Sequence, residues 1–186
     1  MCPESIYQDA KALLTEQGFA VTEVWYHGTS SALVDSILIE GLKRSGDKAI
    51  KQAAKQTMAT IGNAYTESIE PIFLTQSKEL AYYWAEQTVT NRAVRFEGEE
   101  LPAVLAVDLP EALAAGVKPD VGAASLLMTK EGEAFMVFVS ALYENSALAP
   151  LNIDLKSADR LAYLNLLGMA YYNNDIDAAY VRLVSK

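Results

Sequence analysis

Residues 24–42 constrain the fold of this chain more than any other stretch, because two kinds of secondary structure meet there. The β-branched and aromatic residues before His27 favour a strand, and the periodic apolar residues up to Gly41 favour a helix. Between them, His27, Gly28 and Thr29 are predicted to form a tight turn, where a glycine allows close approach of a ligand. His27 is the only histidine in the 186 residues. We therefore expect this segment to form one wall of a ligand pocket.

The composition limits the class of protein. A chain with 51% apolar and 21% charged residues has enough material for the core of one domain. Its 15 Lys and Arg against 24 Asp and Glu give a net charge of −9, which disfavours a nucleic-acid partner. The single cysteine, Cys2, excludes an intrachain disulfide, and the sequence has no Cys/His cluster that would predict a metal site.

The N-terminal segment and the apolar runs bear on location. Glu4 and Asp9 stand where a signal peptide would carry a basic region followed by an apolar stretch. No run reaches the length of about 18 apolar residues that a membrane span requires. We therefore expect a cytoplasmic protein without a membrane partner.

The order of the other predicted elements gives the fold class. We expect strands at 21–26, 71–75, 102–109 and 134–142, and a last strand or turn at 148–153. We expect helices at 4–17, 32–40, 47–61, 78–87, 110–116, 158–171 and 176–184. Because helices and strands do not alternate regularly, the pattern predicts an α+β fold. It forms a single domain, 1–186, with a core at about 20–154, an N-terminal helix at 4–17 and C-terminal helices at 157–185.

The densest basic region of the acidic chain follows the first strand–helix segment. It contains Lys43, Arg44, Lys48, Lys51 and Lys55. These residues are either a solvated helix face, the usual role of such a run, or a surface that steers an anionic ligand toward His27.

The sequence lacks the glycine-rich phosphate-binding motifs and a nucleophile elbow. Three other segments stand out in chain order: the first is 26–30 with 37–42, the second is 72–75 with 77–82, and the third is Glu133 before the apolar run 135–139. Taken together, they resemble the ADP-ribosyltransferase fold in its poly(ADP-ribose)-polymerase-like branch, which has a His–Tyr–Glu signature. The resemblance covers about residues 24–140.

The resemblance implies a split β-sheet core with flanking helices and a helical C-terminus. It also implies an NAD-dependent ADP-ribosyltransferase, which cleaves the nicotinamide–ribose bond and transfers ADP-ribose to a protein or small-molecule acceptor. NAD would be the co-substrate, and no metal would be needed. The catalytic residues would be His27 and Glu133, with the glutamate stabilising the cation that develops on the ribose.

The same resemblance assigns the NAD-binding residues. His27 would hydrogen-bond the adenosine ribose, and Gly28 would present its backbone to the nicotinamide carboxamide. Tyr82 would stack on the nicotinamide ring, with Phe73 near it. Thr29 completes the implied set.

Two departures from the family pattern keep alternatives open. Pro71 and Phe73 stand where the second motif usually has Gly and Tyr. Glu131, Glu133 and Glu144 all lie near the predicted last long strand, so the motif does not single out one glutamate. The alternatives are an enzyme similar to RNA 2′-phosphotransferases, and a non-catalytic module that binds NAD or ADP-ribose on the same scaffold.

Overall fold

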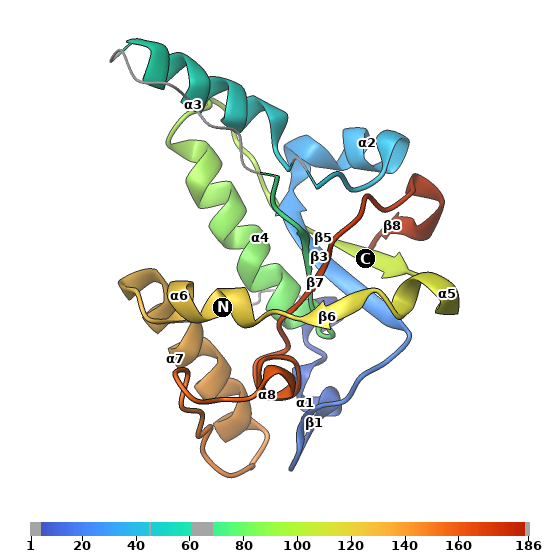
Figure 1. Cartoon of the computed structure of the whole chain (residues 1–186), viewed down its shortest axis with the longest axis vertical. Coiled ribbons are helices and arrows are strands. Elements are labelled where there is room, and N and C mark those ends of the chain that lie inside the picture. The colour runs from blue at the N-terminus through green and yellow to red at the C-terminus, as the bar shows by residue number, and fades with distance from the viewer. Residues whose placement is uncertain (1–4, 45, 61–68, 185–186) are drawn as a thin grey trace.

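The structure, a computed structural model, describes residues 5–44, 46–60 and 69–184 (Figure 1). It mixes helices with antiparallel sheets, so the predicted α+β class is confirmed. Cys2 lies outside the described residues. None of the helices in the described ranges is long and apolar enough to cross a membrane.

Two three-stranded antiparallel sheets form the centre of the molecule. Their strand orders are β3-β5-β8 and β4-β7-β6. The strands are β3 (Val24–Ser30), β4 (Ile72–Leu74), β5 (Pro102–Asp108), β6 (Val117–Pro119), β7 (Ala170–Tyr172) and β8 (Val181–Leu183). A separate small hairpin pairs β1 (Leu14–Thr15) with β2 (Gly18–Phe19).

A single bridge joins the two sheets. The N–H of Tyr26 donates to the carbonyl of Thr75 at 2.8 Å, and the N–H of Thr75 donates back at 2.9 Å. Beyond this pair, β3 and β4 separate. The two three-stranded sheets therefore meet at this bridge and diverge beyond it, and we call the opening between β3 and β4 the split.

The helices range from one turn to more than four turns, and two of the longer ones, α3 and α4, differ in how they contact the sheets. Their bounds are α1 (Ala10–Leu13), α2 (Ser31–Glu40), α3 (Lys48–Thr60), α4 (Lys78–Ala93), α5 (Glu111–Ala114), α6 (Ala124–Leu127), α7 (Lys130–Asn145) and α8 (Arg160–Asn165). Three 3-10 turns span Ser5–Tyr7, Val121–Ala123 and Ala178–Tyr180. Helix α4 packs along β3 and β5, whereas α3 projects from the body of the molecule (Figure 1).

Strand β5 is buried on both faces and supports two parts of the core. Val104 packs with Ala81 and Tyr82 of α4 on one face. Leu105 and Val107 belong to a larger cluster on the other face, with side chains from β3, β4, β7 and β8. This explains the nearly continuous apolar run that predicted the strand.

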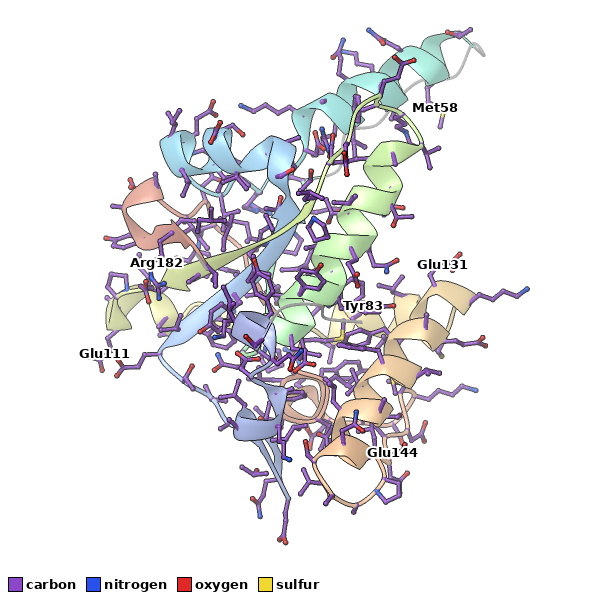
Figure 2. All side chains as sticks on the ribbon, turned by 180° about the vertical axis from the view of Figure 1, so that it is seen from behind. Met58, Tyr83, Glu111, Glu131, Glu144 and Arg182 are labelled. Carbon is purple, nitrogen blue, oxygen red and sulfur yellow. The ribbon has the colours of Figure 1, made fainter. Side chains whose placement is uncertain are left out.

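Aromatic residues of α4 and α7 form a further contact. The Tyr83 ring stacks on Phe138 with centroids 4.9 Å apart, and Trp84 lies 4.8 Å from Phe135. Tyr83 points from α4 toward α7 (Figure 2). The row of aromatic residues at 82–84 thus covers two surfaces, because neighbouring residues on a helix face different directions.

Several predicted elements are confirmed. Ser30 caps α2, where its hydroxyl accepts from the N–H of Ala32, and the helix ends before Gly41. Ser77 caps α4, which extends beyond the predicted residue 87 to Ala93. Helix α3 and strands β4 and β5 also lie close to their predicted positions.

The predictions around the first strand need correction. His27, Gly28 and Thr29 are not a turn but the second half of β3, because β3 pairs with β5 from Val24 to Ser30. The predicted N-terminal helix at 4–17 is replaced by the short helix α1 and the β1–β2 hairpin. Gly18, with φ of +104°, provides the left-handed conformation that turns the chain there.

The predicted strand at 134–142 is wrong, because this segment lies within helix α7. Its apolar run fits a helix as well: Phe135, Val139 and Leu142 are buried at helical spacing, while Val137 is 70% exposed. Thr129 begins the helix by accepting from the N–H of Gly132.

The C-terminal predictions are also wrong. Residues 148–153 contain no strand, and the predicted helix at 158–171 is reduced to α8 followed by β7. The segment 176–184 forms a short 3-10 turn and β8 in place of a helix. The described part of the C-terminus thus adds a strand to each half of the sheet, which local propensity did not indicate.

Candidate functional site

A pocket of about 600 Å³ lies beside the split in the sheet. Its walls come from β3, α2, the α2–α3 connection, the start of α3, and the segment that leads into β4. This volume is within the usual range for small-molecule sites, roughly 300–1,000 Å³. His27, Thr29 and Phe73 line it, so the structure brings these three predicted residues together.

His27 spans the split through its ring. Its Nδ1 lies 2.9 Å from the carbonyl oxygen of Phe73. A carbonyl can only accept, so Nδ1 carries the proton and Nε2 is the acceptor of the neutral ring. Burial lowers the pKa of His27, and the bond to Phe73 only partly opposes this effect. The ring is therefore neutral at pH 7 and can accept a hydrogen bond from a ligand hydroxyl at Nε2.

The peptide groups of Gly28 face the opening between β3 and β4. Residues in an antiparallel strand direct their N–H and C=O alternately to the two sides. Tyr26 directs both groups to Thr75, and Val104, opposite Gly28, accepts from Val184 on its far side. Gly28 therefore directs its N–H and C=O away from β5, toward the side from which β4 has diverged.

Gly28 is a glycine for a reason other than ligand approach. A Cβ at this position would lie 2.0 Å from the carbonyl oxygen of Ala81 and 2.7 Å from the N of Ala85. Helix α4 thus crosses β3 at Gly28, on the face opposite His27 and Thr29. The missing side chain allows the helix to pack against the strand.

Thr29 and Phe73 complete the part of the pocket that the sequence predicted. Thr29 is buried and lines the pocket one residue beyond Gly28. Phe73 is 47% exposed although it is a large apolar side chain. Its exposed ring at a pocket wall is available to stack on a flat ligand group.

The structure does not bring Tyr82 to this pocket. The Tyr82 side chain is buried on the α4 side of the sheet, where its ring lies 5.0 Å from that of Tyr7. It packs with Ala81 and Val104. The role that the resemblance implied for Tyr82 therefore has no support in its position.

Glu131, Glu133 and Glu144 also lie away from His27. All three are exposed on α7 and none lines the pocket, and Glu144 lies at the opposite end of the molecule from Met58 of α3 (Figure 2). The first two belong to the first turn of the helix, where a carboxylate interacts favourably with the helix dipole. Their positions thus have a structural explanation.

Other carboxylates line the pocket. They are Glu40, Asp47 and Glu70. Glu40 forms an ion pair with Lys48 at 3.2 Å, and Asp47 pairs with the buried Arg92. Within the described ranges, no group of three or more His, Cys, Asp and Glu side chains could hold a metal ion.

Glu70 is the pocket residue that sequence reasoning missed. It directly precedes Pro71 and the short strand β4, and it lies on the pocket wall with Phe73. A signal was present, because Glu70 precedes the apolar strand β4 just as Glu133 precedes the apolar run 135–139. That second run folds as a helix.

Comparisons with models of protein families, with curated proteins and with solved structures found no match.

Proposed function

We propose that this chain binds NAD in the pocket beside the split sheet. The observation that carries the proposal is the neutral ring of His27 on the pocket wall, next to Gly28, which does not line the pocket but directs its peptide groups away from β5. A carboxamide has one donor group and one acceptor, so it can pair with both the C=O and the N–H of Gly28. A ribose hydroxyl can donate to Nε2 of His27. Phe73 supplies an aromatic surface for the nicotinamide ring.

ADP-ribosyl transfer is the second candidate function. Breaking the bond between nicotinamide and ribose develops positive charge, which a carboxylate in the pocket would stabilise. Glu70 favours this candidate because it lines the pocket, unlike Glu133. The acceptor would be a protein or a small molecule that enters from the open side.

Calorimetric titration with NAD tests the binding proposal. Replacing His27 with Ala should weaken NAD binding about three- to tenfold, the usual worth of one neutral hydrogen bond. Glu133→Gln is the matched control, since it changes a residue of the sequence motif that lies outside the pocket. Unchanged affinity in His27→Ala, or a loss in Glu133→Gln, would contradict the assignment.

The pH dependence of NAD binding gives an independent readout of His27. Its pKa is lowered from the ordinary value of 6.5, so the ring stays neutral down to that pH and is protonated only below it. Protonation removes the Nε2 acceptor. Affinity should be constant from pH 8 to pH 6.5, fall at lower pH, and lose this dependence in His27→Ala.

Release of nicotinamide separates binding from transfer. If the protein transfers ADP-ribose, incubation with NAD should release nicotinamide, and Glu70→Gln should reduce the rate by about 100-fold or more, as for loss of a group that stabilises charge in the transition state. If NAD binds and no nicotinamide is released, the protein is a non-catalytic module that binds NAD. Release that depends on Glu133 and not on Glu70 would exclude this arrangement.

A further inference from the structure

Several cations gather on the pocket wall formed by the α2–α3 connection and the start of α3, although the chain as a whole carries a net charge of −9. Four cationic residues line this wall: Lys43, Arg44, Lys48 and Lys51. They come from the connection between α2 and α3 and from the first turn of α3. The basic run in the sequence is thus partly a pocket wall.

Lys43 and Lys48 already have carboxylate partners, and Lys51 is not free either. Nζ of Lys43 lies 3.6 Å from Asp175, and Nζ of Lys48 lies 3.2 Å from Glu40. Arg44 differs, because its Nε is shielded from solvent and has no hydrogen-bond partner. A buried donor on a charged group is costly to leave unpaired. Arg44 also lines the pocket, and none of the described carboxylates pairs with its guanidinium, so it is the cation on this wall best placed to pair with an incoming anion.

The backbone of Arg44 is held in place from the C-terminal segment. Its N–H donates to Oδ1 of Asp175 at 2.9 Å. Two residues earlier, the carbonyl of Leu42 accepts from the N–H of Ile176, also at 2.9 Å. The base of the Arg44 side chain is thus fixed before any ligand binds, which reduces the entropy cost of ordering it.

We propose that Arg44 binds the phosphates of the ligand, and hence that the pocket takes nucleoside diphosphate conjugates in preference to nucleosides. The inference rests on the proposed function and adds the residue that recognises the charged centre of NAD. The planar guanidinium can donate two parallel hydrogen bonds to phosphate oxygens. Lys43 and Lys48 keep their own carboxylates and contribute less.

Binding of ADP and of adenosine to the full chain tests this role. Arg44→Gln should weaken ADP binding at least tenfold while adenosine affinity changes less than twofold. Arg95→Gln is the matched control, since Arg95 is an exposed cation that does not line the pocket. Arg44→Lys keeps the charge without the planar fork and should fall between the two. It also serves if Arg44→Gln fails to fold.

The outcomes separate this inference from the proposed function. ADP binding that is equal in wild type and Arg44→Gln would overturn the role of Arg44, even if NAD binds through His27. An equal loss of ADP and adenosine would also overturn it, because Arg44 would then act only through the structure. Arg44-dependent binding of inorganic pyrophosphate without NAD binding would support the anion site and reject the proposed function.

Discussion

Gly28 allows close packing of α4 and lies between two residues that line the candidate pocket. Its absent side chain allows α4 to cross β3, while its peptide groups face the split in the sheet. The neighbouring His27 and Thr29 point to the opposite face and line the pocket. Adjacent residues of a strand alternate between faces, so one short segment of β3 packs against α4 on one face and lines the pocket on the other.

Replacing Gly28 with Ala should destabilise the fold by about 3 kcal/mol, because the new methyl group would overlap the backbone of α4. Its position would be only 2.0 Å from the carbonyl oxygen of Ala81. Gly122→Ala is the control, since the nearest atom there is a carboxylate oxygen of Asp120 at 3.2 Å. Urea unfolding of both variants checks the prediction, and equal midpoints would show that α4 does not restrict this site.

At the scale of elements, α3 depends on one buried ion network. Asp47 caps α3 by accepting from the N–H groups of Ala49 and Ile50, and its second oxygen pairs with Arg92 of α4. Arg92 also forms a two-point contact with Glu100, at 2.6 and 2.9 Å. Apart from this network, none of the described helices and strands makes extensive contact with α3. The network therefore sets the position of this part of the basic pocket wall.

Arg92→Met should destabilise the protein by about 3 kcal/mol, since it leaves two largely buried carboxylates without their cation. The hydrogen bonds from Arg92 lower the pKa of Glu100 below its ordinary value of 4.5. Because the pKa of Glu100 is lower in the folded state, the stabilisation that its pairing with Arg92 provides is present above pH 4.5 and is lost as the pH falls below that value. Denaturant unfolding should show that the difference in free energy of unfolding between Arg92→Met and wild type becomes smaller as the pH is lowered from 7 to 3.

The exposed Arg95 provides the control for that experiment. Arg95→Met should change the free energy of unfolding by less than about 0.5 kcal/mol, as surface substitutions usually do. A similar loss in both variants would mean that the Arg92 network adds no more than an exposed cation.

At the scale of the whole molecule, the C-terminal segment holds the two halves of the sheet and the pocket wall together. Strand β7 pairs with β4, and β8 pairs with β5. Between them, Ile176 bridges to Leu42 and is 1% exposed within the larger core cluster. Segments far apart in the sequence thus complete the sheet (Figure 1).

Ile176→Ala should lower the free energy of unfolding by about 2–5 kcal/mol, because it removes buried methyl groups and leaves a cavity at this junction. Leu183→Ala, on β8 but 41% exposed, should cost about 1 kcal/mol or less. Thermal unfolding followed by calorimetry compares the two. If Leu183→Ala lowered the free energy of unfolding more than Ile176→Ala, the C-terminal segment would stabilise the protein mainly through β8.

Features encoded by neighbouring residues could be predicted from the sequence alone. Caps such as Ser30 and Ser77 act on N–H groups within three residues, and the apolar run of β5 reflects burial on both faces. The local pattern also placed His27 beside a glycine between a strand and a helix, although the predicted turn is part of β3. The family resemblance added Thr29 and Phe73, and all three residues line the pocket.

Tertiary structure decided the rest, because the deciding contacts lie far apart in the sequence. The run at 134–142 suits either a strand or a helix, and packing of Phe135 and Phe138 against α4 selects the helix. Strands β7 and β8 are three residues each and form only because β4 and β5 offer partners. The same long-range packing brought Glu70, and not Glu133, into the pocket of His27. A local sequence pattern carries no information on such pairings.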